Sequence, residues 1–274
     1  MSVGTLYMVS TPIGHLGDFS FRGVEVLRGV AVIACEDTRH TRRLLTRYEI
    51  EKPSVSIHAH TRDATLERLL DRVAAGEEVA YVTDAGTPGI SDPGGLLAER
   101  AHARGLRVVP IPGPGAVTAA LAAAGFPADR FLFLGFLPRK GTARAGLVQG
   151  MKRDPWTTVC YEAPGRTTAL LRELAAACGV DRPAAVAREL TKVHEEVRRG
   201  TLGALAEYYR AHPPRGEITI VVGGRPGKAE PAAAEDPEAV VAALAGSGPP
   251  AAVAKELARR LGISRQDAYR RLTG

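Results

Sequence analysis

Short apolar runs alternate with helix-like segments along the first half of the chain. The apolar runs contain many β-branched residues, as strands do, and they cover residues 6–10, 31–35, 54–58, 79–83 and 107–111. Apolar residues at helical spacing fill the intervals at residues 38–48, 63–75 and 94–104. Because such alternation requires crossover connections, the first half is predicted to be an α/β domain with a largely parallel sheet.

A second series of strand-like runs begins after the alanine-rich segment 115–125, which predicts a helix leading away from the first sheet. These runs cover residues 131–137, 156–163, 184–190 and 218–224, and the clearest helix between them is residues 165–179. We therefore expect two tandem α/β domains, at residues 1–115 and 116–225, with a cleft between them. Ligand pockets are frequent in such clefts.

The composition changes after residue 225 and predicts a linker at 226–247, rich in Pro, Ala and charge. Residues 248–274 then predict two short amphipathic helices, with Gly262 ending the first and Ser264 capping the second. This outline fits a helix-turn-helix or, equally, a small helical hairpin that caps the body.

Charge is concentrated in this tail, although the whole chain carries only +6 from 36 Lys+Arg and 30 Asp+Glu. A basic tail favours a polyanionic partner, and a solvated helix face is the ordinary alternative. The basic residues of the tail are Lys255, Arg259, Arg260, Arg265, Arg270 and Arg271.

Cysteine usage and hydropathy indicate a cytoplasmic protein. Cys35, Cys160 and Cys178 show no CxxC spacing and lie in apolar or helical stretches, as buried thiols of a reducing compartment do. No segment approaches about 18 uncharged apolar residues, and no basic region precedes an apolar one at the N-terminus. We expect neither a signal peptide nor a membrane span.

Several common site motifs are absent from the sequence. GxGxxG and GxxxxGK[ST] do not occur, so dinucleotide and P-loop sites lose their main support. HExxH, paired CxxC and GxSxG are also missing, and the histidines are scattered. We therefore expect no metal ion.

Four loops that follow predicted strands carry the candidate chemistry: residues 10–18, 35–45, 83–94 and 110–117. In a parallel sheet the carboxyl ends of strands meet at one edge, where ligands bind in open α/β folds. Each loop has a local explanation too, since Asp37 or Thr38 can simply cap a helix and PGPG can form a tight turn. Their joint position at one edge favours a shared ligand site.

Five motifs follow one another along the chain: LYMVSTPIGHLGDFSFR, CEDTRHTRRLL, TDAGTPGISDPG, PIPGPGAVTAAL and GFLPRKG. In this order they resemble the small-subunit ribosomal RNA methyltransferase I family, which belongs to the tetrapyrrole-methylase class of S-adenosylmethionine (SAM) enzymes. The resemblance implies a two-domain α/β homodimer that binds folded SAM between its domains. It also implies 2′-O-methylation of a cytidine in the decoding centre of 16S ribosomal RNA, within the small ribosomal subunit.

The same resemblance implies which positions hold the cofactor. They are Pro12, Ile13, Thr87, Ile90, Gly115, Ala116 and Thr118. Gly86 joins them because glycine permits the close backbone approach that a folded cofactor requires.

Catalysis requires little more than alignment of the reacting atoms, together with a group that eases proton loss from the ribose hydroxyl. The candidates are Glu36, Asp37, Asp84, Lys140 and Glu162. Lys140 could polarise the hydroxyl, act as a base if burial lowered its pKa, or only hold a phosphate.

RNA binding is expected to depend on cations, because only 5% of residues are aromatic and no RNA-recognition platform is visible. The candidates are Arg39, Arg42, Arg139, Lys140, Arg166, Arg259 and Arg260. Three alternatives stay open: a SAM enzyme acting on a tetrapyrrole or a protein side chain, a nucleotide hydrolase, and a non-catalytic ribosome-assembly factor.

Overall fold

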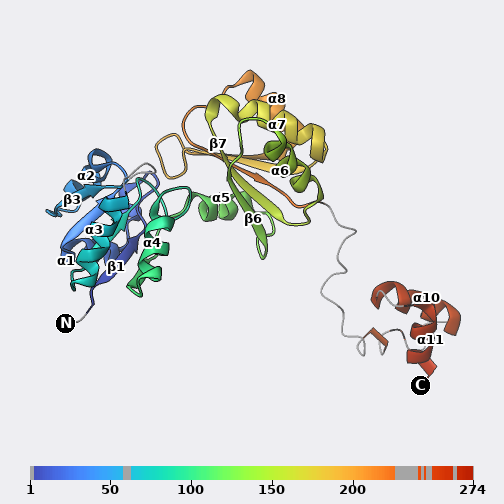
Figure 1. Cartoon of the computed structure of the whole chain (residues 1–274). Coiled ribbons are helices and arrows are strands. Elements are labelled where there is room, and N and C mark those ends of the chain that lie inside the picture. The colour runs from blue at the N-terminus through green and yellow to red at the C-terminus, as the bar shows by residue number, and fades with distance from the viewer. Residues whose placement is uncertain are drawn as a thin grey trace. The chain divides into compact units, whose positions relative to one another are not determined.

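The computed structural model describes residues 3–57, 63–225, 240–241, 244, 249–261 and 264–273. Contacts divide the chain into two units, Met1–Arg225 and Pro226–Gly274, and each is treated separately below (Figure 1).

The first sheet has five parallel strands in the order β3-β2-β4-β1-β5. The parallel sheet predicted for the first half is therefore confirmed, and each strand lies within a predicted run or starts one residue before it. The strands are β1 (Thr5–Val9), β2 (Val32–Cys35), β3 (Ser54–Ser56), β4 (Val79–Val82) and β5 (Arg107–Ile111).

Helices cover both faces of this sheet because its strands are apolar on both sides. In β2, Val32 and Ala34 pack with residues of α3 and α4, whereas Ile33 and Cys35 pack with residues of α1 and α2. The helices are α1 (Phe21–Gly29), α2 (Thr38–Arg47), α3 (Asp63–Ala74) and α4 (Gly94–Ala103). The sequence patterns did not single out α1.

The second sheet is mixed, with the order β6-β7-β10-β8-β9. Only β6 and β7 run parallel, and the other neighbouring pairs are antiparallel. Its strands are β6 (Phe131–Phe136), β7 (Thr157–Glu162), β8 (Pro183–Arg188), β9 (Glu196–Thr201) and β10 (Ile218–Val222). With the first sheet, it gives the predicted fold of two α/β domains in tandem.

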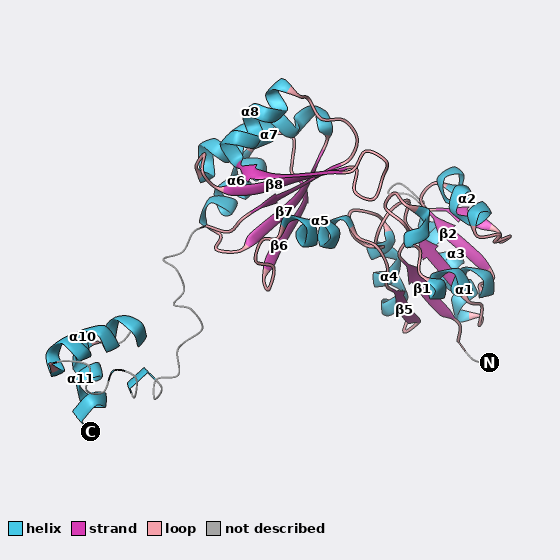
Figure 2. Ribbon diagram, turned by 180° about the vertical axis from the view of Figure 1, so that it is seen from behind, coloured by secondary structure: helices cyan, strands magenta, loops and turns pink. Residues whose placement is uncertain are grey.

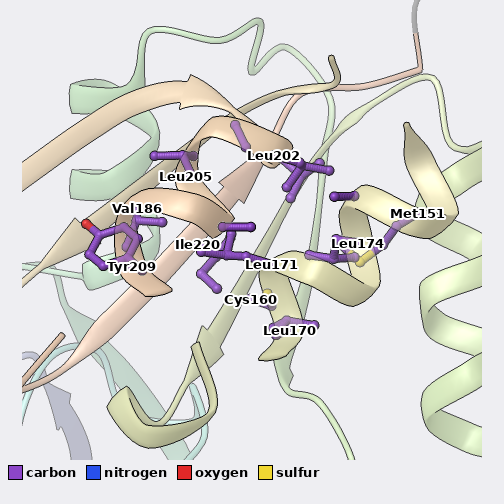
Figure 3. Packing of buried hydrophobic residues seen from close by; sticks show 14 of the residues in the cluster. Met151, Cys160, Leu170, Leu171, Leu174, Val186, Leu202, Leu205, Tyr209 and Ile220 are labelled. Carbon is purple, nitrogen blue, oxygen red and sulfur yellow. The ribbon is translucent and has the colours of Figure 1, made fainter. Parts of the chain in front are cut away.

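Three helices pack on one face of the second sheet, and α5 (Ala116–Ala124) packs on the other (Figure 2). The three are α6 (Thr142–Arg153), α7 (Pro164–Cys178) and α8 (Leu202–Ala211). Leu170, Leu171 and Leu174 of α7 are fully buried against the sheet (Figure 3), and each such side chain contributes about 1.5–3 kcal/mol of hydrophobic stabilisation. Ile13, from the loop after β1, joins the α5 face, so it links the first sheet to the core of the second.

The second unit contains α10 (Pro250–Leu261) and α11 (Arg265–Thr273) around a small core that includes Leu257 and Ala268. Ser264 Oγ accepts a hydrogen bond from the Asp267 N–H at 3.1 Å, as predicted for the N-cap of the second helix. Gly262 and most of the expected linker lie outside the described residues. Among the helices described, none combines the length and apolarity needed to cross a membrane.

Candidate active site

A cavity of about 850 Å³, hereafter the first cavity, lies between the two sheets of the first unit. All four predicted loops contribute to it, through Ile13, Glu36, residues 83–87 and 90–92, and residues 115–118. The second sheet and its loops contribute Phe131, Phe133, Phe136, residues 161–164 and residues 216–219. The structure thus brings together loops that are more than a hundred residues apart in sequence.

Asp92 shapes the loop that follows β4. Its carboxylate accepts hydrogen bonds from the N–H groups of Gly89 at 2.8 Å, Ile90 at 3.1 Å and Gly94 at 2.7 Å. Tyr81 Oη donates to it at 3.2 Å. These bonds fold the segment TDAGTPGISDPG back on itself, so that residues 83–87 and 90–92 line the first cavity.

Short polar contacts join this loop to its neighbours. Thr11 and Gly86 exchange two backbone hydrogen bonds of 2.9 and 3.0 Å, and Gly86 has φ +89°, where glycine is favoured. Thr87 Oγ1 donates to the Pro114 carbonyl at 3.2 Å and accepts from Ser10 Oγ at 3.4 Å. The loops after β1, β4 and β5 are therefore fixed to one another, which explains their glycines and threonines.

Two carboxylates are held at the ends of β2 and β4. Glu36 Oε1 accepts from Thr83 Oγ1 at 2.5 Å and from the Asp84 N–H at 3.0 Å. Asp84 Oδ1 accepts from the Asp37 N–H at 3.1 Å. Both Glu36 and Asp84 line the first cavity.

Asp37 is the N-cap of α2 and lines neither cavity described in this article. Its Oδ1 accepts from the Arg39 N–H at 2.8 Å, and its Oδ2 pairs with the Arg39 guanidinium at 2.8 Å. These hydrogen bonds from Arg39 lower the pKa of Asp37 to about 2. A carboxylate with so low a pKa is a weak base near neutral pH.

Glu162, at the end of β7, is a fully buried carboxylate in the wall of the first cavity. Its Oε1 accepts from the Ala163 N–H at 2.8 Å and from Arg166 Nε at 2.6 Å. Arg144 lies 3.9 Å from its Oε2 and pairs with Glu173 at 2.6 Å. Glu162 is thus paired in the folded protein, and Arg166 is committed to it.

The charge of the first cavity is one-sided. Its described lining contains carboxylates and four aromatic rings but no Lys, Arg or His. The carboxylates belong to Glu36, Asp84, Asp92, Glu162 and Glu217, and the rings to Phe131, Phe133, Phe136 and Tyr161. Such a lining suits a cationic ligand with an aromatic part and disfavours a polyphosphate.

Most of the predicted cofactor positions line the first cavity: Ile13, Gly86, Thr87, Ile90, Gly115, Ala116 and Thr118. Pro12 instead lines a second cavity of about 300 Å³, which adjoins the first. Together, the seven positions and the cavity volume fit a bent nucleoside cofactor, since ligand pockets measure roughly 300–1,000 Å³.

The other predicted residues are absent from the described lining of the first cavity. Arg39, Arg42, Arg139 and Lys140 are exposed. Lys140 is absent from the described lining of both cavities, so the structure offers no contact that would single it out as a base. Arg259 and Arg260 belong to α10, but their side chains fall outside the described part of the chain. No cluster of metal-ligating side chains occurs among the described residues.

From the second sheet, sequence reasoning named Glu162 but missed the other residues that line the site. The rings of β6 and residues 216–219 carry no motif, because their role depends on which strands become neighbours in space. Glu162 was visible as the charged residue of CYEAPGR, at the end of an apolar run.

Comparisons with known proteins agree with this geometry. The sequence model of the Tetrapyrrole (Corrin/Porphyrin) Methylases matches residues 5–206. The solved structures of diphthine synthase and of a Thermus thermophilus uroporphyrin-III C-methyl transferase complexed with S-adenyl homocysteine have similar folds. Their TM-scores are 0.63 and 0.57, at 17% and 18% identity, over 80% of this chain and 90% and 97% of theirs. At this identity the likeness concerns the fold alone.

Much closer relatives share most of the chain. The proteins called ribosomal RNA small subunit methyltransferase I from Xylella fastidiosa and Mesorhizobium japonicum are each 44% identical to it. The alignments cover 97% of this chain and 98% and 90% of theirs. The Thermotoga maritima protein of the same name is 40% identical, over 81% of this chain and 100% of its own. The chain therefore belongs to the ribosomal RNA small subunit methyltransferase I family, within the tetrapyrrole methylases.

Proposed function

We propose that this protein transfers the methyl group of SAM to the ribose 2′-hydroxyl of a cytidine in the decoding centre of 16S ribosomal RNA. The assembled small subunit is the substrate in this proposal, and the enzyme acts as a homodimer. Family membership supports a SAM-dependent methyltransferase acting on small-subunit RNA, and the first cavity supplies the physical argument.

The charge of the first cavity carries the proposal. SAM has a sulfonium and an ammonium group against one carboxylate, so its net charge is positive at neutral pH. A lining of carboxylates and aromatic rings without a described cation attracts such a ligand, whereas ATP would meet repulsion there. This argues against a nucleotide hydrolase.

The cofactor contacts are assigned to the loops after β1, β4 and β5. The side chains proposed to contact the cofactor are those of Ile13, Thr87, Ile90 and Ala116, with Pro12 in the adjoining cavity. Two glycines, Gly86 and Gly115, leave the backbone accessible to the ligand. Thr118 lines the same wall. When bound, SAM supplies a methyl group on a sulfonium centre, and the sulfur keeps the electron pair of the broken bond.

Asp84 is the proposed acceptor of the hydroxyl proton. It lines both cavities, and its carboxylate is oriented by the Asp37 N–H at 3.1 Å. Glu36 holds the backbone of Asp84 from the other side at 3.0 Å, so Glu36 and Asp37 act as positioning residues. A proton acceptor placed in this way accelerates transfer by about 10²–10⁴-fold.

Exposed cations are the proposed contacts to the RNA backbone. Arg39 and Arg42 lie on α2, and Arg139 and Lys140 lie on the connection between β6 and α6. The tail residues Arg259 and Arg260, whose side chains lie outside the described part of the chain, complete the proposed set, and Arg166 is left out because it is paired with Glu162. Cations that neutralise phosphates make binding steeply salt-dependent.

The decisive experiment uses SAM labelled in its methyl group and small subunits from cells that lack this protein. After transfer, the RNA is digested to nucleosides, and we expect the label in 2′-O-methylcytidine. Label in another nucleoside would refute the proposed acceptor. Binding of the subunit without SAM affinity would identify an assembly factor instead, and light scattering would test the homodimer.

A further inference from the structure

The second cavity adjoins the first along a common wall. Both are lined by Ile13, Thr83, Asp84, Ala85 and Glu217. The second cavity continues beneath α2, where His40, Arg43 and Leu44 line it, and reaches Lys192 in the loop between β8 and β9. Its volume of about 300 Å³ is close to the lower limit of roughly 300 Å³ for ligand pockets, so it suits a small unit such as one nucleotide.

The two cavities differ in charge. The described lining of the first contains five carboxylates and no Lys, Arg or His, whereas that of the second contains Arg43, Lys192 and His40 together with the shared carboxylates of Asp84 and Glu217. Arg43 is exposed and makes no ion pair with any described residue. A guanidinium in the lining of a cavity, with no ion-pair partner among the described residues, is available to bind an anionic ligand.

Lys192, in the same lining, is held as a cation. Its Nζ lies 3.1 Å from Glu189 Oε1 and 3.1 Å from Glu217 Oε1. Partial burial alone would lower the pKa of Lys192, but hydrogen bonds and charges of these two carboxylates outweigh burial and raise it. Glu217 belongs to the common wall, so Lys192 is tied to the boundary between the cavities.

The loop that carries Lys192 is bent at a conformational cost. Glu189 and Thr191 have φ values of 51° and 62°, in the region that side chains other than glycine seldom adopt. Thr191 Oγ1 accepts from the His15 N–H at 3.0 Å, and the Thr191 N–H donates to Glu195 Oε2 at 2.6 Å. The loop from the second sheet is thus fastened to the loop after β1, with Lys192 beside the second cavity.

We propose that the second cavity is the acceptor subsite, in which a single unpaired nucleotide of the RNA places its ribose against the common wall while Arg43 and Lys192 bind its flanking phosphate. This inference rests on the proposed function and deepens it. In-line transfer requires the attacking oxygen to approach the methyl carbon from the side opposite the sulfur. Two adjoining cavities with Asp84 in their common wall would bring the acceptor and the methyl donor to the same place from different cavities.

The reaction balances at this wall. The 2′-oxygen bonds to the methyl carbon, the carbon–sulfur bond breaks with its electron pair going to sulfur, and the hydroxyl proton passes to the Asp84 carboxylate and then to water. On this proposal a ribose inside a duplex is disfavoured, because a cavity of about 300 Å³ has room for one nucleotide but not for a base pair.

The test compares Arg43→Ala with Arg47→Ala in the full-length protein. Both residues are exposed arginines of α2, but Arg47 lines neither cavity. Titration calorimetry measures the dissociation constant of S-adenosylhomocysteine, and steady-state transfer to small subunits gives KM and kcat. Cytidine 5′-monophosphate, added in the presence of S-adenosylhomocysteine, is the direct probe of the second cavity.

We expect Arg43→Ala to raise KM for the subunit, and the dissociation constant of the nucleotide, roughly tenfold, as for loss of one charged hydrogen bond. The slope of log affinity against log salt should fall by about 0.7, as expected for one single-stranded phosphate contact. Arg47→Ala should leave both quantities and the affinity for S-adenosylhomocysteine unchanged.

Lys192→Ala is the second test variant. It should weaken the binding of cytidine 5′-monophosphate but not the binding of S-adenosylhomocysteine. The subsite is refuted if Arg43→Ala and Arg47→Ala have the same KM for the subunit and the same affinity for the nucleotide. It is also refuted if Lys192→Ala lowers the affinity for S-adenosylhomocysteine but not the affinity for the nucleotide. A wild-type protein that methylates no RNA would refute the proposed function, which is a separate outcome.

Discussion

At the scale of single residues, Asp84 is the proposed proton acceptor, because it lines both cavities and is held by the Asp37 N–H and the Glu36 carboxylate. Asp37 is next to it but is committed to Arg39 and to the start of α2. Two neighbouring carboxylates thus have different roles, set by their hydrogen bonds.

Replacing Asp84 by Asn keeps the size of the side chain and an acceptor for the Asp37 N–H but removes the proton acceptor. We expect kcat to fall by about 10²–10⁴-fold, with affinity for S-adenosylhomocysteine retained. Single-turnover transfer and calorimetry measure the two quantities. Asp71→Asn, on the exposed face of α3, is the control, and an equal loss in both variants would exclude Asp84 as base.

The carboxyl of Asp37 should titrate near pH 2, and in Arg39→Ala its midpoint should rise towards the ordinary value of 3.8. Since folding lowers this pKa, the contribution of Asp37 to stability is present above the unfolded pKa and is lost as the pH falls towards 2. Its partly exposed side chain is screened by solvent, which keeps that contribution small. Carbon-13 NMR of the carboxyl measures the midpoint, and an unchanged value in the variant would contradict the assignment to Arg39.

At the scale of elements, the strands of the first sheet could be read from the sequence because each lies in a short apolar run, and β2 and β4 are buried along their whole length. The strand β9 (Glu196–Thr201) could not, because EVRRGT is polar and only half buried. The antiparallel pairing of the second sheet also escaped prediction, since no local pattern determines which strand lies beside β10.

The same contrast between local sequence patterns and strand order explains which site residues could be predicted. Ile13, Thr87 and Ala116 belong to motif-bearing loops at one sheet edge, so their convergence could be expected. Phe133 and Thr219 reach the first cavity only because β6 and β10 occupy particular places in the second sheet.

Gly14 allows the loop between β8 and β9 to lie against the loop after β1. A Cβ there would lie 2.6 Å from Lys192 Cγ and 2.7 Å from Thr191 Oγ1. We expect Gly14→Ala to lower the free energy of unfolding by about 1–3 kcal/mol, as for overpacking, and to reduce transfer.

Gly29→Ala is the matched control, because a Cβ at the end of α1 meets nothing within 4 Å. Alanine also favours helix, so this variant should be neutral or slightly more stable. Urea denaturation and transfer assays compare the two, and equal behaviour would show that the contact at Gly14 is unimportant.

At the scale of the whole molecule, the two units have different proposed functions. The first cavity, the second cavity and both sheets belong to Met1–Arg225, whereas α10 and α11 belong to Pro226–Gly274. SAM binding should therefore depend on the first unit alone, and the basic tail should add only to RNA affinity.

Removal of residues 226–274 should leave the dissociation constant of S-adenosylhomocysteine unchanged and weaken binding to the small subunit, with a shallower salt dependence. A full-length variant with Lys255→Gln, Arg270→Gln and Arg271→Gln separates charge from the loss of the whole unit. Filter binding across a salt series measures both, and an affinity equal to that of the intact chain at every salt concentration would remove the tail from the RNA surface.

The common wall of the two cavities also has a consequence for inhibitor chemistry. A compound that joins an adenosine-like group to a cytidine phosphate through a short spacer could occupy both cavities at once. Only one molecule would then lose its translational freedom, so the affinities of the two halves would reinforce each other. Such a bisubstrate compound would bind this protein more tightly than other SAM enzymes, because its cytidine half would fit only an enzyme with a second cavity bounded by Asp84 and Glu217.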